Sequence, residues 1–96
     1  MDMITINAFL TAKEGSEEEL FHELKKVIEP SRNEAGCIDY VLHRSLDDSS
    51  VFVFYETWKD QEALQAHIDS DHYQAYREAT QDLTSSREVH KLEKVQ

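Results

Sequence analysis

Residues 55–76, YETWKDQEALQAHIDSDHYQAY, join the end of a strand to a helical region and determine how the rest of the chain must fold around them. The strand pattern ends at Trp58, and apolar residues then recur at helical spacing. His67 and His72 lie in the helical part, close in sequence to Trp58, Glu56 and three tyrosines. This mixture is typical of a small aromatic pocket with acid–base groups on its wall.

Upstream of this stretch, the sequence predicts a β-hairpin. Residues 51–58, VFVFYETW, form the strongest strand pattern, because they are apolar on both faces and rich in β-branched and aromatic side chains. Residues 37–45 alternate and predict a second strand, and the polar residues 46–50 predict the turn between them. Gly36 marks the end of the preceding unit.

The N-terminal part predicts a strand followed by an amphipathic helix. Residues 3–12 alternate between apolar and mixed faces, as a strand does. Residues 16–34 carry apolar side chains at helical spacing, and Ser16 with Glu19 matches a capping box. Pro30 is expected to kink or end this helix.

The C-terminal part completes the order β-α-β-β-α-β. Asp60 can cap a helix, Ser70 or Asp71 can start a further helical segment, and residues 87–95 alternate weakly and predict a last strand. This order predicts a ferredoxin-like α+β sandwich, with four antiparallel strands and helices on one face. The other face would be partly apolar and need a cover, so we expect a homodimer.

Composition limits the classes of partner. The 96 residues suffice for one domain, residues 1–96, whose core alone is modest. A formal charge of −10 repels phosphate backbones and anionic lipids, so we expect neither nucleic acid nor membrane as a partner. Cys37 is the only cysteine, which excludes an internal disulfide and a cysteine zinc site. With no signal-like or membrane-spanning segment, a cytoplasmic location is expected.

The chain resembles the antibiotic biosynthesis monooxygenase (ABM) family, in particular its small quinol-monooxygenase-like members. The most specific part is the spacing H-x-x-x-x-H-aromatic after E-x-W. The matching residues are Gly36, Cys37, Ile38, Tyr40, Glu56, Trp58, Asp60, Glu62, Ala63, Leu64, His67, Ser70, His72, Tyr73 and Tyr76. The resemblance implies a dimeric α+β barrel of two ferredoxin-like subunits, with a pocket between each sheet and its own helices.

Relatives of this kind have several activities. Some oxidise aromatic polyketides or quinols with dioxygen and no cofactor, some degrade haem, and some isomerise a phosphorylated signalling molecule. Asn7 and Trp58 match the haem-degrading pattern, but Arg77 stands where that pattern needs a histidine, so haem degradation is disfavoured. The isomerase branch shares the histidine spacing, and Arg44 or Arg77 would have to bind its phosphate.

The leading interpretation is a cofactor-independent monooxygenase that acts on a small quinol or aromatic phenol and dioxygen. The catalytic candidates are His67, His72, Trp58 and Asn7, and the substrate-binding candidates are Phe54, Glu56, Tyr40, Tyr73 and Tyr76. His67 or His72 would remove the substrate proton, and Asn7 would stabilise the developing negative charge. Trp58, Phe54 and the tyrosines would bracket the ring, with Glu56 placed to orient a histidine.

Structural roles compete with each of these assignments. Trp58, Tyr73 and Tyr76 could be core residues, and His67 and His72 do not share an ideal helical face. The histidines expected at the surface or in an interface are His22, His43 and His90. A metal site from His67, His72, Asp71 and Glu56 lacks a recognised ligand spacing, so no metal is predicted. A signal isomerase and a non-catalytic binding module therefore remain as alternatives.

Overall fold

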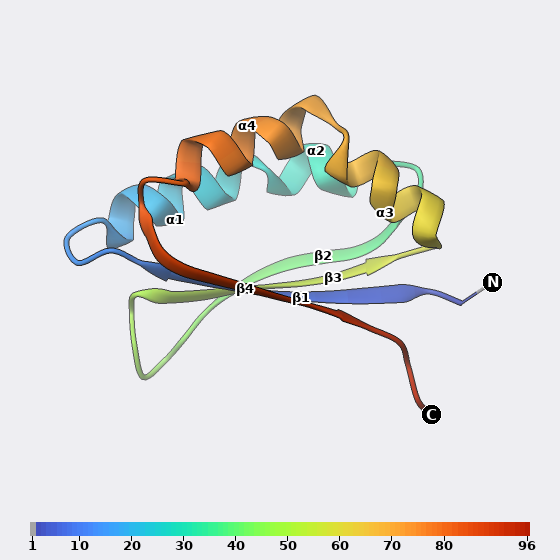
Figure 1. Ribbon diagram of the computed structural model, residues 1–96, viewed down its shortest axis with the longest axis horizontal. Helices are drawn as coiled ribbons and strands as arrows, with labels where there is room; N and C mark the ends of the chain where they lie inside the picture. The colour runs from blue at the N-terminus through green and yellow to red at the C-terminus, as the bar shows by residue number, and fades with distance from the viewer. Residues whose placement is uncertain (1) are drawn as a thin grey trace.

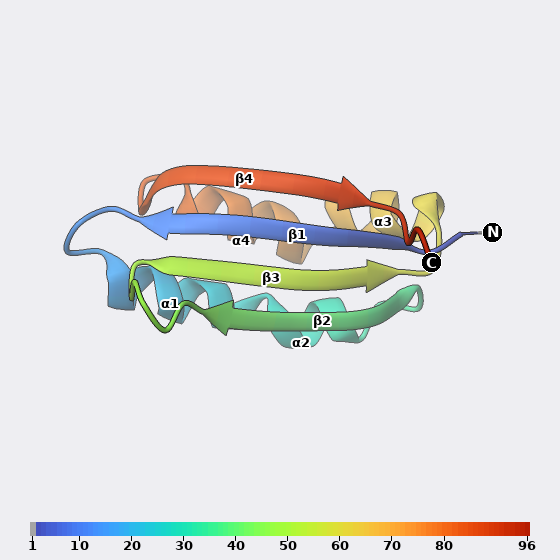
Figure 2. The same ribbon diagram turned by 90° about the horizontal axis from the view of Figure 1, so that it is seen from below.

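The computed structural model describes residues 2–96 and has the element order predicted from the sequence. The strands are β1 (Ile4–Ala12), β2 (Cys37–Arg44), β3 (Val51–Trp58) and β4 (Thr84–Leu92). The helices are α1 (Glu17–Lys26), α2 (Ile28–Arg32), α3 (Gln61–Ile68) and α4 (Asp71–Thr80). The strands form one antiparallel sheet in the order β2-β3-β1-β4, and the helices cover one face of it (Figures 1 and 2). This is the ferredoxin-like α+β sandwich that was predicted.

The two central strands, β1 and β3, supply most of the core because their side chains alternate between the two faces of the sheet. In β1, Ile6, Ala8 and Leu10 face the helices and are buried. In β3, the helix-facing residues are Phe52, Phe54, Glu56 and Trp58, and all four are buried. The same alternation that builds the core therefore carries one carboxyl group, that of Glu56, under the helices.

The first helical region differs in detail from its prediction. The helix breaks at Val27, three residues before Pro30, whose missing N–H cannot bond the carbonyl of Lys26. The predicted capping box at Ser16 is wrong, because this residue has φ −105° and ψ 8° and its side chain makes no capping hydrogen bond. Acidic residues in the first turn of α1 still complement the helix dipole.

The two later helix starts match their predicted caps. The Asp60 carboxylate accepts a hydrogen bond from the Ala63 backbone N–H at 2.8 Å. The Ser70 hydroxyl accepts one from the Tyr73 N–H at 3.2 Å and so begins α4. These caps direct α3 and α4 over the same side of the sheet (Figure 1).

Strand β4 begins and ends earlier than predicted, at Thr84 and Leu92 rather than at residues 87 and 95. Its first residues pair with the end of β1, where Thr84 lies opposite Ala12 beside an irregularity in the register. Residues 84–86 are all polar and show no apolar alternation, so the sequence did not predict this part of the strand. It is a strand because it pairs with β1.

Gly36 allows a close approach between the segment before β2 and the start of α3. A Cβ atom at Gly36 would lie 2.2 Å from the Ala63 Cβ, which is far inside van der Waals contact. The Gly36 carbonyl also accepts a hydrogen bond from the Lys59 N–H at 2.9 Å. These contacts hold the segment that carries Glu34 against the helix that carries His67.

The face of the sheet opposite the helices carries exposed apolar side chains. Phe9 on β1, Tyr55 on β3 and Leu92 on β4 are 39%, 43% and 41% exposed. They point away from the helices, on the side of the sheet that is uncovered in Figure 1. None of the helices in residues 2–96 combines the length and apolarity needed to cross a bilayer.

We predict that this outer face forms a homodimer interface, since a second copy would bury its apolar side chains. Light scattering at micromolar concentration should give twice the monomer mass of 11.2 kDa. Phe9→Glu should give the monomer mass, because it places a charge in the interface. Leu46→Glu is the matched control, since Leu46 is fully exposed in the turn between β2 and β3. A monomeric wild-type protein would refute the prediction.

Candidate functional site

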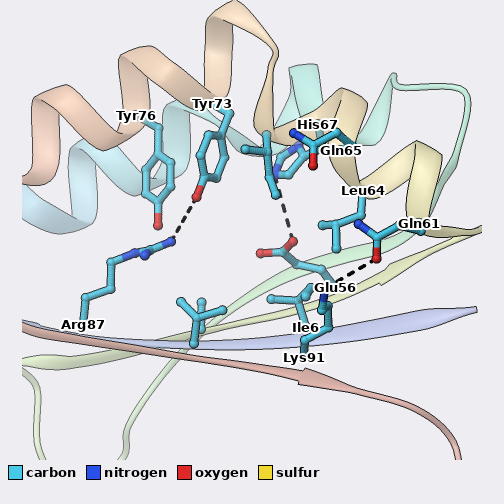
Figure 3. Close-up of a pocket in the computed structure, with 13 residues that line it drawn as sticks. Ile6, Glu56, Gln61, Leu64, Gln65, His67, Tyr73, Tyr76, Arg87 and Lys91 are labelled. Carbon is cyan, nitrogen blue, oxygen red and sulfur yellow. Dashed lines mark hydrogen bonds and ion pairs between the residues drawn. The ribbon is translucent and has the colours of Figure 1, made fainter.

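A pocket of about 280 Å³ lies between the sheet and the helices α3 and α4 (Figure 3). Its apolar wall is made by Ile6, Ala8, Leu64, Ile68 and Val89. Its polar wall is made by Glu56, Gln61, Gln65, His67, Tyr73, Tyr76, Arg87 and Lys91. An apolar cavity with a few convergent polar groups is the usual form of a small-molecule site.

His67 is held on one side by a carboxylate that the sequence analysis did not single out. Its Nδ1 lies 2.7 Å from Oε2 of Glu34, in the segment between α2 and β2. The His72 Nε2 lies 2.7 Å from the same oxygen. An ionised carboxylate can only accept, so both imidazoles donate to it. This network assigns the proton of neutral His67 to Nδ1 and leaves Nε2 without one.

The free nitrogen of His67 lies at the pocket. His67 is 1% exposed, and its buried Nε2 has no hydrogen-bond partner within residues 2–96. The nearest acidic oxygen is Oε1 of Glu56, at 4.0 Å (Figure 3). Burial lowers the pKa of His67, and the hydrogen bond and charge of Glu34 only partly oppose this. At neutral pH the side chain is therefore an uncharged base.

Glu56 lies across from His67, and its pKa is shifted in the other direction, upward. Its Oε1 accepts a hydrogen bond from the Trp58 indole N–H at 3.0 Å. Burial raises the pKa of Glu56 to about 7, while the Trp58 hydrogen bond and the positive charge of Arg87 act in the other direction. Near neutral pH this carboxyl group is present in both forms, so it can donate or accept a proton.

Aromatic side chains fix the plane of the His67 imidazole. Trp58 stacks on it with ring centroids 4.3 Å apart and an interplanar angle of 30°. Tyr40 and Tyr73 meet it edge-on, with centroids at 5.6 and 5.0 Å. With Glu34 bonded at one end, the ring has little freedom to turn its Nε2 away from the pocket.

The other end of the pocket holds the Arg87 guanidinium and two phenols, those of Tyr73 and Tyr76. The Tyr73 hydroxyl accepts hydrogen bonds from Arg77 Nη1 at 3.3 Å and from Arg87 Nη2 at 3.2 Å. Tyr76 lies beside Arg87 (Figure 3), and burial raises the pKa of its hydroxyl. The Tyr76 hydroxyl therefore stays a protonated donor at neutral pH.

The structure brings four of the nine candidate site residues to the pocket wall, namely His67, Glu56, Tyr73 and Tyr76. Trp58, Phe54 and Tyr40 lie behind the wall in the core, at 0%, 0% and 2% exposure. They cannot bracket a substrate ring directly, because other side chains separate them from the cavity. His72 lies outside the pocket and contacts Glu34 instead.

Asn7 lies on the wrong face of the sheet for its assigned role. It pairs across the sheet with Tyr55 and His90, all on the face away from the helices, whereas its neighbours Ile6 and Ala8 face the pocket. Asn7 therefore cannot stabilise charge on a substrate held beside His67 in the same subunit. For the same reason, Asn7 no longer supports the match to the haem-degrading pattern.

The basic residues named for phosphate binding also lie away from the pocket wall. Arg44 bonds Glu18 at 2.8 Å, and Arg77 contacts the pocket only through the Tyr73 hydroxyl. Arg87 and Lys91 line the pocket instead. The sequence did contain a signal for these two residues. Arg87, Val89 and Lys91 alternate along β4, so the strand period of two places all three on one face of the sheet.

Glu34, His67 and His72 also form the cluster of potential metal ligands in the described residues, with ligand atoms within 4.8 Å of one another. This set differs from the one weighed from the sequence, because Glu34 takes the place of Glu56 and Asp71. The 2.7 Å distances from both imidazoles to one Glu34 oxygen are hydrogen-bond distances. A bound cation would have to separate these atoms, so the observed arrangement is a hydrogen-bonded cluster.

Comparisons with known proteins agree with this architecture. The family model described as antibiotic biosynthesis monooxygenase matches residues 3–79. The Bacillus subtilis (strain 168) protein named "Putative monooxygenase YcnE" is 30% identical over 84 residues, which are 88% of this chain and 88% of that protein. The Synechocystis protein sll1783, named as uncharacterized, is 29% identical over 94 residues, and the match covers 98% of this chain but 64% of that protein.

Among solved structures, PA3566 from Pseudomonas aeruginosa superposes with a TM-score of 0.95 and 32% sequence identity. The match covers 100% of this chain and 97% of that one. The family model, the sequence relatives and the shared fold all agree with the resemblance seen in residues 36–76. The chain belongs to the antibiotic biosynthesis monooxygenase family.

Proposed function

We propose that this protein is a cofactor-independent monooxygenase that oxidises a small quinol or aromatic phenol with dioxygen, and that His67 is its general base. Membership of the family supports a monooxygenase-like function in general terms. The observation that carries the specific proposal is the Nε2 of His67, a buried basic nitrogen at the pocket that has no hydrogen-bond partner among residues 2–96. We also propose that it acts as a cytoplasmic homodimer.

The first step is removal of a proton from the substrate hydroxyl by Nε2 of His67. A neutral imidazole with a lowered pKa is available for this at physiological pH. The imidazolium that results keeps its Nδ1–H directed at the Glu34 carboxylate, whose charge stabilises it. His72 donates the second hydrogen bond to Glu34 and holds the carboxylate in place.

The resulting phenolate is electron-rich and can pass an electron to dioxygen. A hydroquinone and dioxygen would give a hydroxyquinone and water. Each product takes one of the two oxygen atoms of dioxygen. All the electrons come from the substrate, so no separate reductant is required. In its protonated form Glu56 can donate the proton that the reduced oxygen needs, because burial raises its pKa to about 7.

A second candidate is an isomerase that moves a proton between two positions of a small carbonyl compound. It is favoured by one observation, the 4.0 Å separation of His67 Nε2 and Glu56 Oε1 across the pocket wall. A neutral base next to a carboxyl group that titrates near pH 7 suits proton transfer without oxidation. The two candidates differ in their need for dioxygen.

We predict that the wild-type protein consumes oxygen with at least one member of a panel of quinols, above the rate of spontaneous oxidation. His67→Ala should lower the rate by about 10²–10⁴-fold, the usual contribution of a general base, and Glu34→Gln should lower it less. His22→Ala should leave the rate unchanged, since His22 is exposed on α1. An oxygen electrode measures all four proteins. No oxygen uptake by folded wild-type protein would reject the proposal and leave the isomerase or a non-catalytic binding module.

The pH dependence of kcat/KM should be bell-shaped. The acidic limb should lie below about pH 6.5, the ordinary histidine value, because burial lowers the pKa of His67 and only its neutral form is a base. The alkaline limb should lie near pH 7, where Glu56 loses its proton. Glu34→Gln should move the acidic limb to lower pH, since it removes a charge that favours the imidazolium, and Glu56→Gln should remove the alkaline limb. An acidic limb above 6.5 would contradict the assignment of His67.

A further inference from the structure

Arg87 is a half-buried cation without a counter-ion in the part of the chain that the structure describes. It extends from β4 into the pocket, and Figure 3 shows its guanidinium next to Tyr73 and Tyr76. Within residues 2–96, no carboxylate comes within ion-pair distance of it. Its Nε is also buried and has no hydrogen-bond partner among these residues. Charges removed from water in proteins are ordinarily paired, so the half-buried Arg87 guanidinium is suited to a negatively charged partner.

The neighbouring hydroxyl group lacks an acceptor as well. Tyr73 receives hydrogen bonds from both Arg77 and Arg87, and no acceptor for its own O–H is present among the described residues. A phenol that accepts from two cations is polarised and becomes a stronger donor. Arg87 and Tyr73 therefore present hydrogen-bond donors to the pocket for which residues 2–96 supply no acceptor.

A second cation lies along the same strand. Lys91 lines the pocket, and its ammonium group donates a hydrogen bond to the Gln61 side-chain oxygen at 3.4 Å. Among the described residues, Glu56 is the only acidic one on the wall, and near neutral pH it is partly protonated. The pocket thus concentrates positive charge in a chain whose formal charge is −10. This local reversal of sign favours a negatively charged ligand.

We propose that the substrate of this pocket is an aromatic carboxylate, and that its carboxylate group is bound by Arg87 and Tyr73 while its ring hydroxyl faces His67. A planar guanidinium matches a carboxylate through two parallel hydrogen bonds, and the Tyr73 hydroxyl adds a third donor. The Lys91 ammonium supplies further attraction at the pocket wall. The reaction of the bound ring rests on the function proposed above, but the binding of the acid does not.

The test compares an acid with its neutral amide. Binding of 2,5-dihydroxybenzoate and 2,5-dihydroxybenzamide is measured by titration calorimetry at about pH 7.5, where the acid is ionised, without oxygen. The wild-type protein should bind the acid roughly 10-fold or more tightly than the amide, because only the acid gains charge-assisted hydrogen bonds. Arg87→Met should abolish this preference, and Arg87→Lys should keep part of it.

Lys13→Met is the control, because it removes one positive charge from an exposed position that does not line the pocket. It should keep the full preference for the acid. Circular dichroism checks that each variant is folded, and the uncharged Arg87→Gln replaces Arg87→Met if the latter is not. Equal binding of acid and amide, no binding of either, or a preference that survives at full size in the uncharged Arg87 variant would overturn the proposal.

The outcomes also separate this inference from the proposed oxidation. A protein that binds the acid through Arg87 but consumes no oxygen with it supports the carboxylate site and argues against the monooxygenase. A protein that oxidises neutral quinols but shows no preference for acids supports the monooxygenase and overturns the carboxylate site.

Discussion

The hydrogen bond between Glu34 and Nδ1 of His67, at 2.7 Å, is the interaction on which the rest of the site depends. It joins two segments that are far apart in the sequence, the turn before β2 and the end of α3. It can form because Gly36 lets Ala63 come close and because Asp60 fixes the start of α3. Without this carboxylate, the proton of His67 would not be held on Nδ1, and Nε2 would not be defined as the acceptor at the pocket.

Burial then gives the two groups on either side of the pocket opposite but complementary properties. Removal from water disfavours the charged form of each, so the pKa of His67 falls while that of Glu56 rises to about 7. A neutral base and a partly protonated acid consequently lie 4.0 Å apart at physiological pH. The charge in this pocket comes mainly from Arg87 and Lys91, which explains how an acidic protein can still favour an anionic ligand.

The fold could be predicted because its signals are local. Alternation in residues 51–58 defines the central strand, and Asp60 and Ser70 cap their helices as a polar residue before an apolar run suggests. Alternation also placed Glu56 on the same face as Trp58. The same rule places Asn7 on the other face of the sheet from its neighbour Ile6. The sequence therefore already contained evidence against a role for Asn7 in the pocket. The position of Trp58 behind the wall, rather than in it, depends on packing between elements.

Glu34 and Arg87 could not be identified from the sequence with the same ease. Glu34 is one of many acidic residues near a helix end, and only the tertiary contact with α3 distinguishes it from the others. Arg87 opens the part of β4 that was predicted, but its lack of a counter-ion is a property of the assembled pocket. Ion pairing and burial both depend on neighbours that are distant in the chain.

The central claim is that Glu34 holds neutral His67 with its proton on Nδ1 and its Nε2 free. Nitrogen-15 NMR of the histidine rings at neutral pH, with His67→Gln to assign the signals, tests it directly. The account predicts a neutral His67 ring protonated at Nδ1, and loss of this tautomer preference in Glu34→Gln. A His67 ring protonated at Nε2, or a charged imidazolium, would contradict it.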